Sequence, residues 1–261
     1  MQSHPLIDAL SPAMFAAGAL IERIREGGVE TRDKADASPV TIADEQAEAL
    51  LTAAIRAVDA GEIVGEEAHA AGHRPDPCAR FWLIDPLDGT RDFIAGRAAY
   101  SVNIALIEGG VPVLGLVLSP RDGVLWAGAK GLGAFRQVGV EGTRLAIITQ
   151  PMRPLPVVVV SYSHMDPETA AWVAGLGACA LEPAGSSLKF CRLADGSADV
   201  YPRYGPTCEW DTAAGHAVLL AAGGAMQGMD GAAFGYGKPE YKNGGFLAVG
   251  DPGAFDRLPR R

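Results

Sequence analysis

Two aspartates, a glycine and a threonine follow an apolar run in this chain of 261 residues. The run covers residues 81–84, and Asp85, Asp88, Gly89 and Thr90 come after it. The run predicts a buried strand, whose end would hold the two acids rigidly. Carboxylates this close repel each other unless one is protonated or a cation lies between them. Because oxygen ligands suit a hard cation such as Mg²⁺, the pattern favours a metal site over a solvated Asp-Gly turn.

Two further glutamates occupy a similar position in the sequence. Glu66 and Glu67 follow a short strand-like pair at residues 63–64. Taken alone they would be a charged loop. Strand ends of one sheet often meet at a site, however, so we expect them near Asp85.

Asp211 and Asp44 each have a structural and a functional interpretation. Asp211 precedes an apolar run that stops at residues 223–224, which predicts a helix N-cap worth about 1 kcal/mol. A carboxylate at a helix N-terminus stays ionised, as a metal ligand must, so both interpretations can hold. Asp44 forms a capping-box pattern with Thr41, and on that pattern alone it is structural.

Gly89 and Thr90 begin a segment whose N–H groups could face a phosphate oxygen, with the Thr90 hydroxyl placed to orient a water. Of the five histidines only His69 and His73 have HxxxH spacing and none has HxH spacing; we expect no zinc site, and we expect His216 to be packed or capping. Residues 185–187 lack a G-x-S-x-G context, so a serine hydrolase is not supported.

Composition restricts the partners and the location. Lys and Arg number 22 and Asp and Glu number 31, and the net charge of −9 disfavours a nucleic-acid polymer or an anionic membrane surface. The four cysteines are far apart, as in reduced cytosolic proteins. The N-terminus lacks a signal-peptide pattern, and the longest apolar stretch, residues 213–226, is too short to span a bilayer. We expect a cytoplasmic protein with no transmembrane segment.

The first part of the chain predicts helices packed on an antiparallel sheet. Apolar residues recur at helical spacing over residues 6–24, and residues 41–60 form a second amphipathic pattern. Three strand-like runs separated by turn residues follow the aspartate turn, at residues 101–107, 111–118 and 124–129. We expect these strands to form a meander covered by the two helices.

A proline-rich stretch at residues 151–156 is the best domain boundary. It divides residues 1–150, an α+β metal-binding half, from residues 151–261, a smaller α/β half that selects the substrate. The second half opens with a β-branched run at residues 157–160, typical of a strand buried on both faces. Short helices and strands then alternate: helices at 167–176, 187–194 and 211–222, strands at 178–182 and 198–201.

Four ordered motifs match one family. Residues 85–90 resemble the D-P-[IL]-D-G-T signature of the inositol monophosphatase superfamily, and residues 210–214 with 223–224 resemble its W-D-x-A-A and A-G-G. Residues 65–67 match G-E-E, and residues 34–44 match K-x-D-x-S-P-V-T-x-A-D. Within the superfamily, residues 185–191 and 198–207 are most similar to the 3′(2′),5′-bisphosphate nucleotidases of the CysQ type.

The resemblance implies a layered αβαβα sandwich with the site between two halves. It implies two Mg²⁺ ions, a third in some members, and inhibition by lithium. The implied metal ligands are Glu66, Asp85, the Leu87 carbonyl, Asp88 and Asp211. Glu66 would also orient the attacking water, and Thr90, hydrogen-bonded to Asp44, would align or deprotonate it.

The implied substrate contacts come from both halves. Gly89 and Thr90 would hold the phosphate through their N–H groups, and Tyr201 or Tyr204 could stack on a base. The other contacts that the resemblance implies are Leu87, Asp88, His164, Ser186, Lys189, Arg203 and Asp211.

The implied reaction is removal of the 3′-phosphate of adenosine 3′,5′-bisphosphate to give AMP, in sulfur assimilation. The sulfated relative 3′-phosphoadenosine 5′-phosphosulfate is a second substrate of that kind.

An inositol-1-phosphate or sugar-phosphate monophosphatase is the alternative within the superfamily. A haloacid-dehalogenase-type phosphatase has D-x-D-G-T, whereas here one more residue separates Asp85 from Asp88. A non-catalytic metal-dependent binder is the third alternative. A homodimer and peripheral membrane association, both found among relatives, stay open.

Overall fold

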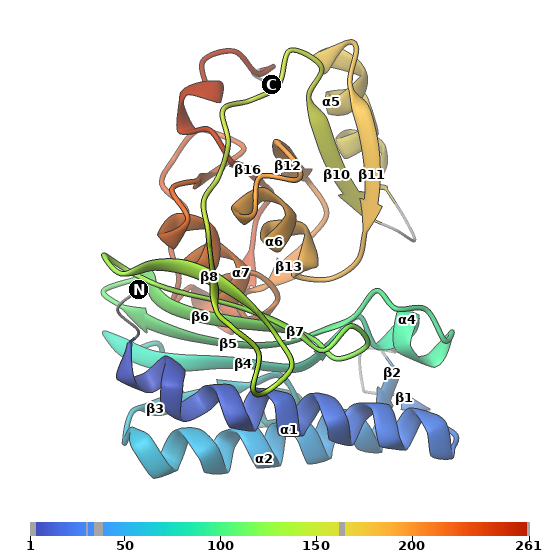
Figure 1. Ribbon diagram of the computed structural model, residues 1–261, viewed down its shortest axis with the longest axis vertical. Coiled ribbons are helices and arrows are strands. Elements are labelled where there is room, and N and C mark those ends of the chain that lie inside the picture. The colour runs from blue at the N-terminus through green and yellow to red at the C-terminus, as the bar shows by residue number, and fades with distance from the viewer. Residues whose placement is uncertain (1–3, 30, 34–38, 162–164, 260–261) are drawn as a thin grey trace.

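The computed structural model describes residues 4–29, 31–33, 39–161 and 165–259. Its elements stack in five layers (Figure 1). Helices α1 (Pro5–Gly27) and α2 (Ile42–Val58) form the first layer and cover a seven-stranded sheet. Helices α6 (Leu188–Ala194) and α7 (Glu209–Ala221) lie between that sheet and a five-stranded sheet, which α5 (Pro167–Leu176) covers from outside. The expected αβαβα sandwich is confirmed.

The seven-stranded sheet follows chain order, from β3 to β9. Only β3 pairs in parallel, with β4, and every later pair is antiparallel, as the meander predicted. The strands are β3 Glu62–Gly65, β4 Arg80–Asp88, β5 Ser101–Glu108, β6 Val111–Ser119, β7 Val124–Ala129, β8 Gly133–Val138 and β9 Leu145–Ile147. The last two were not expected. β9 is a short edge strand with little burial, so pairing with a neighbour defines it rather than an apolar pattern.

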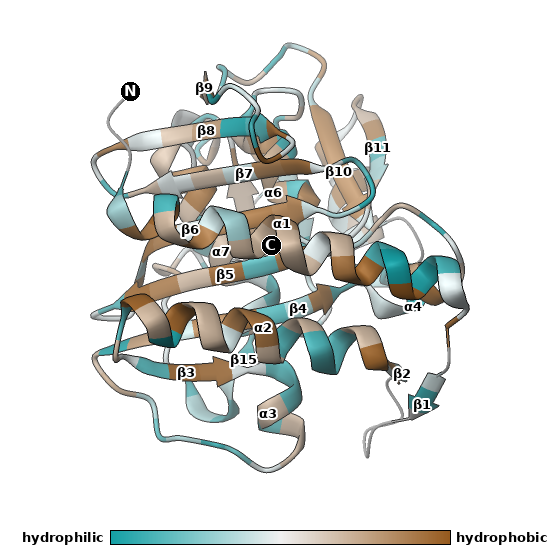
Figure 2. Cartoon of the chain, turned by 60° about the horizontal axis from the view of Figure 1, so that its bottom comes forward, coloured by the Kyte–Doolittle hydropathy of each residue, from teal (hydrophilic) through white to brown (hydrophobic). Residues whose placement is uncertain are grey.

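Successive side chains along each strand point to opposite faces of this sheet, and both faces are buried. Trp82 and Ile84 face α1 and α2, which lie alongside each other over the sheet (Figure 2). Leu83 and Ala105 belong to a second apolar cluster that includes α7. The face that carries Leu83 also carries Asp85, two residues further on, so the aspartate points toward the α7 layer.

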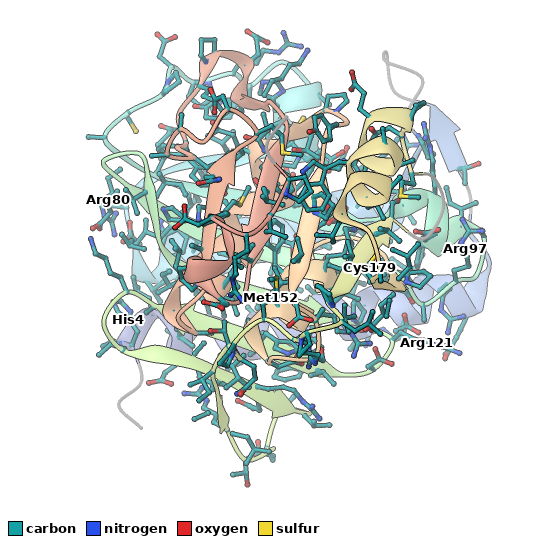
Figure 3. All side chains as sticks on the ribbon, turned by 90° about the horizontal axis from the view of Figure 1, so that it is seen from above. His4, Arg80, Arg97, Arg121, Met152 and Cys179 are labelled. Carbon is teal, nitrogen blue, oxygen red and sulfur yellow. The ribbon has the colours of Figure 1, made fainter. Side chains whose placement is uncertain are left out.

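One end of β4 is tied to α2 and the other carries the aspartates. Arg80, at the start of the strand, donates to Asp59 just beyond α2, with Nη1 2.9 Å from Oδ1. In Figure 3 Arg80 lies at one margin of the molecule, and Arg97, which follows the aspartate turn, lies at the opposite margin. The aspartate end of β4 is therefore far from this ion pair.

Helix α1 is long and apolar enough to cross a membrane by length and composition, the one such helix among the described residues. Leu10, Met14 and Ile21 on it are completely buried in the cluster beneath α1 and α2. Core helices of globular proteins pass the same length test, and the packing of α1 accounts for its apolar face.

The second sheet has the order β11-β10-β12-β16-β14 and is mixed. β10 pairs in parallel with β11 and β12, and the remaining pairs are antiparallel. Its strands are β10 Val157–Ser161, β11 Ala180–Ala184, β12 Val200–Arg203, β14 Ala225–Gly228 and β16 Phe246–Val249. Short elements complete the fold: β1 Thr31–Asp33, β2 Pro39–Thr41, α3 Glu66–Ala70, α4 Thr90–Ile94, β13 Thr207–Cys208, β15 Lys242–Asn243 and 3₁₀ turns at Pro239–Tyr241 and Pro252–Ala254.

The two expected halves share one apolar cluster. Leu83 and Val117 of the first sheet and Phe246 of the second belong to it, and Ala213 and Val218 of α7 join them. The chain passes from one sheet to the other between β9 and β10, across the proline-rich stretch. The division at residue 150 stays a prediction.

Candidate active site

The parallel pairing of β3 and β4 brings two acidic positions to one edge of the sheet. Gly65 is the register partner of Ile84, so Glu66 and Asp85 are the next residues at the same end. Parallel strands end side by side, and the convergence expected from the sequence follows from this register.

A bulge shapes the aspartate turn. The register with β5 shifts between Asp85 and Asp88, so the two carboxylates are not simply two positions of a regular strand. Asp85 is 1% exposed, and its Oδ1 accepts the Leu87 N–H at 3.1 Å. Gly89 has φ of 98°, and a Cβ there would lie 2.8 Å from the Ala99 carbonyl oxygen. Only glycine fits that position without strain.

Asp211 lies in the first turn of α7, not at its N-cap. Cys208 is the N-cap, and Asp211, three residues later, accepts the Cys208 N–H at 2.8 Å. The prediction of an Asp211 N-cap was therefore wrong. The reason is that β13 pairs with β15 and holds Cys208 in extended conformation, so the helix begins at Glu209.

Ser187 joins the two sides of the site. Its N–H donates to Asp88 Oδ2 at 2.8 Å, and its Oγ donates to the Asp211 carbonyl at 2.6 Å. Ser187 is 1% exposed. The sequence predicted a contact for its neighbour Ser186 but not for Ser187, because these bonds join groups that are far apart in the sequence.

The acidic groups lie within one another's electrostatic field. Burial raises the pKa of Asp85 well above its ordinary value, and the charges of Glu66, Asp88 and Asp211 raise it further. Burial likewise raises the pKa of Asp211, with Asp88 and Glu66 adding to the rise. Burial also raises the pKa of Asp88, to about 6, although Lys189 opposes the shift. A cation among them would reverse the effect, because an opposite charge favours the ionised carboxylate.

This donor set fits Mg²⁺. All the groups are oxygens, as that ion prefers. Across the described residues, no three acidic, histidine or cysteine side chains stand close enough together to form a metal-binding group by themselves. Mg²⁺ does not require such a cage, because it keeps several waters and usually binds one or two carboxylates together with substrate phosphates.

Thr90 connects the aspartate turn to α2. Its Oγ1 lies 3.1 Å from Asp44 Oδ1 and 3.0 Å from the Leu87 carbonyl, and its single proton can be donated to one of them at a time. The expected hydrogen bond between Thr90 and Asp44 is present. Asp44 also makes the expected capping box, because its Oδ2 accepts the Thr41 N–H at 2.8 Å. The structural interpretation of Asp44 is therefore confirmed, and its catalytic role stays a prediction.

A cleft of about 490 Å³ opens beside these groups. Lys189 is one of its lining residues, and burial lowers the pKa of this lysine to about 8. Arg203 also lines it and donates through Nε to the Gly205 carbonyl at 3.2 Å. The other lining residues are Pro39, Glu66, Asp88, Gly89, Thr90, Arg91, Asp92, Ser161, Ser186, Phe190, Tyr201, Pro206, Thr207, Asp211 and Thr212.

Ser186, which lines this cleft, has an unsatisfied hydroxyl. Its φ is 48°, a conformation that non-glycine residues seldom adopt, and its buried Oγ has no hydrogen-bond partner. His164, expected beside it, lies outside the described residues.

The two tyrosines considered for base stacking differ. Tyr201 borders the cleft but packs edge-on against Phe190 and Phe246, which makes it a core aromatic. Tyr204 lines a different cavity, with Trp172. His216 is packed as expected: it is 3% exposed and its Nδ1 lies 3.0 Å from the Tyr236 hydroxyl.

Comparison with known proteins agrees with this geometry. The model of a family described as the inositol monophosphatase family matches residues 2–254. The chain is 41% identical over 234 residues to the 3′(2′),5′-bisphosphate nucleotidase CysQ of Salmonella typhimurium, which covers 88% of this chain and 94% of that protein.

Solved structures resemble the whole fold. The structure of CysQ from Bacteroides thetaiotaomicron, a bacterial member of the inositol monophosphatase family, aligns with a TM-score of 0.79 and 32% identity over 94% of this chain and 96% of that one. The inositol monophosphatase of Anabaena aligns with a TM-score of 0.75 and 26% identity over 97% of this chain and 96% of that one.

Proposed function

The chain belongs to the inositol monophosphatase family, and we propose that it is a Mg²⁺-dependent 3′(2′),5′-bisphosphate nucleotidase. The reaction would remove the 3′-phosphate of adenosine 3′,5′-bisphosphate to give AMP, and that of 3′-phosphoadenosine 5′-phosphosulfate to give adenosine 5′-phosphosulfate. One observation carries the proposal: the cleft is lined both by the carboxylates of Glu66, Asp88 and Asp211 and by the cations Lys189 and Arg203. A metal-bridged phosphate at the carboxylates and a second anionic group at the cations would suit that lining.

The acidic groups would hold the metal. The proposed ligands are the side chains of Glu66, Asp85, Asp88 and Asp211 and the carbonyl of Leu87, with waters and substrate oxygens completing the coordination. Two bound Mg²⁺ ions would neutralise the phosphate and lower the pKa of a water. With these cations in the cleft, a chain of charge −9 can accept a polyanion.

Thr90 and Asp44 would orient the attacking water. When Thr90 donates its proton to Asp44, its oxygen is left as an acceptor, and a water that donates to it is fixed in direction. Asp44 is 1% exposed and held by Thr41, so this acceptor cannot move away. The water oxygen would then attack phosphorus while the bond from phosphorus to the 3′-oxygen breaks. The first N–H groups of α4, from Gly89 and Thr90, are proposed to hold the phosphate.

The second half would select the substrate. A bisphosphate nucleotide keeps one phosphate, which needs cationic or N–H partners. Lys189 and Arg203 supply the charges, and the Ser186 hydroxyl supplies a polar group without a partner in the protein. The cytoplasm is the proposed location, since all four cysteines are free thiols.

Release of inorganic phosphate tests the function. We expect the highest kcat/KM on adenosine 3′,5′-bisphosphate with Mg²⁺, loss of turnover with a chelator, and inhibition by lithium. A preference for inositol 1-phosphate would instead favour the alternative within the family. Trapping of a phospho-aspartate would favour a covalent mechanism, and no turnover of any ester would favour a binder.

A further inference from the structure

Glu48 is a buried acid that the cleft does not contain. It lies on α2, one helical turn after Asp44, and is only 7% exposed. Glutamate is seldom buried unless it is paired. Its carboxylate reaches α3, where Oε2 accepts the Glu67 N–H and Oε1 accepts the Ala68 N–H, both at 2.8 Å.

These bonds replace a missing helix cap. The residue before α3 is Gly65, which has no side chain to accept the first N–H groups of the helix. Glu48 accepts two of them from a different element. A negative charge at this end of a helix also interacts favourably with the exposed N–H groups.

The backbone at Gly65 is shaped around the same carboxylate. A Cβ built on Gly65 would lie 2.4 Å from Glu48 Cδ and 2.5 Å from its Oε2, which is far inside van der Waals contact. Any side chain at position 65 would therefore displace Glu48 or the end of β3. Glycine is required here by the close approach of an acid, not by an unusual φ.

Glu66 lies between these two contacts. Gly65 before it touches the Glu48 carboxylate, and the N–H of Glu67 after it binds that carboxylate. The backbone of Glu66 is thus fixed on both sides by the Glu48 side chain. This fixes the position from which the Glu66 side chain extends toward the cleft.

We infer that Glu48 is a positioning residue that holds Glu66 for metal binding. The inference rests on the proposed function, because it assumes that Glu66 is a ligand. Helix α2 then carries two acids, four residues apart, that each hold a group of the cleft. Asp44 accepts a hydrogen bond from the Thr90 hydroxyl. Glu48 fixes the backbone on either side of Glu66. Because one rigid helix carries both, the distance between a metal ligand and the group that orients water is set by α2.

The test is calorimetric titration of the metal-free protein with Mg²⁺, without substrate, for wild type, Glu48→Gln and Glu48→Ala. Loss of groups that orient ligands typically costs about 10- to 100-fold in metal affinity. We expect a weakening in that range for Glu48→Ala. Glu48→Gln should weaken binding less, because its amide oxygen still accepts one of the two N–H groups.

Glu45→Gln is the matched control. Glu45 lies on the same helix and also carries a negative charge, but it is exposed and pairs with Arg32 at 2.9 Å. Its Mg²⁺ affinity should equal that of wild type. Melting temperatures of the metal-free proteins separate the two possible roles. A purely structural cap would lower the melting temperature of the Glu48 variants and leave their Mg²⁺ affinity unchanged, and that result would overturn the inference.

Two further outcomes are decisive. If Glu48→Ala does not fold, the near-isosteric Glu48→Gln decides, and wild-type affinity in that variant counts against a positioning role. If wild-type protein binds no Mg²⁺, the proposed function itself fails. If the wild type and the Glu48 variants bind Mg²⁺ equally well, the proposed function stands and only the inference about Glu48 fails.

Discussion

At the scale of single residues, the site depends on acids whose charges the protein alone does not compensate. Asp85 is almost completely buried, and its burial and the charges of four nearby carboxylates raise its pKa. A carboxyl group with a raised folded-state pKa contributes stability at low pH, and that contribution is lost as the pH rises through the folded pKa. Above the ordinary carboxyl pKa, the buried Asp85 therefore lowers the stability of the metal-free protein relative to low pH.

Asp85→Asn tests this balance. We expect kcat to fall at least about 100-fold, the size of effect seen when one electrostatic contact to a transition state is removed. The metal-free variant should nevertheless melt no lower than wild type at pH 7, because an amide cannot carry a buried charge. Added Mg²⁺ should raise the melting temperature of wild type more than that of the variant. A metal-free Asp85→Asn that melts well below wild type would show that the carboxylate is structural.

Lys189 gives the site a pH dependence. Burial lowers the pKa of Lys189 to about 8 in the free protein, so the ammonium that would bind the second phosphate is lost as the pH rises through that value. We expect kcat/KM for the bisphosphate to fall above about pH 8, since this ratio reports groups of the free enzyme.

Lys189→Arg is the matching variant, because arginine keeps its charge in this range. Its kcat/KM is expected to be lower near neutrality, since the guanidinium differs in shape, but without the decline above pH 8. If kcat/KM declined above pH 8 in the same way in both proteins, a group other than Lys189 would be responsible for the decline.

At the scale of elements, α7 is placed by a close approach to the first sheet. A Cβ on Gly115 of β6 would lie 2.3 Å from the Ala214 carbonyl oxygen and 2.8 Å from the Ala217 Cβ. Because Ala214 follows Asp211 on the same helix, any outward shift of α7 would move a proposed metal ligand.

Gly115→Ala should therefore affect both stability and activity. Forcing a group into a packed contact typically costs about 1–3 kcal/mol. We expect a lower melting temperature and a lower kcat, with Mg²⁺ affinity reduced because Asp211 is displaced. Gly27→Ala is the control, because a Cβ on Gly27 meets nothing within 4 Å. A Gly115→Ala variant that matches Gly27→Ala in all three measurements would mean that α7 tolerates the shift.

The elements also show what the sequence could predict. Helices α1 and α2 and strands β5 to β7 were predictable because apolar periodicity and turn residues mark them directly. β8 and β9 were missed because strand pairing defines them more than composition does. The helix containing Asp211 was expected, but its start was not, since the pairing of β13 with β15 decides where it begins.

At the scale of the whole molecule, the fold brings acids from three separated segments to one place. The sequence alone predicted Asp85, Asp88 and Glu66 as neighbours, because strand ends in one sheet converge. Asp44 and Asp211 needed the family resemblance. Glu48 and Ser187 were not predicted. Glu48 accepts backbone N–H groups of a distant segment, and Ser187 donates its own N–H to Asp88, and neither pattern nor composition marks such contacts.

The shared core explains why the site can lie between two sheets. Residues of both sheets and of α7 form one apolar cluster, so the walls of the cleft are held by common packing. Of the cleft's lining residues, Asp88 and Asp211 come from β4 and α7, and Lys189 and Arg203 come from α6 and β12.

The most direct test of the central claim is an anomalous-scattering map of crystals in which Mn²⁺ replaces Mg²⁺. We predict strong peaks among the carboxylates of Glu66, Asp85, Asp88 and Asp211 and the Leu87 carbonyl. A fully occupied ion elsewhere, with no peak among these five groups, would contradict the account.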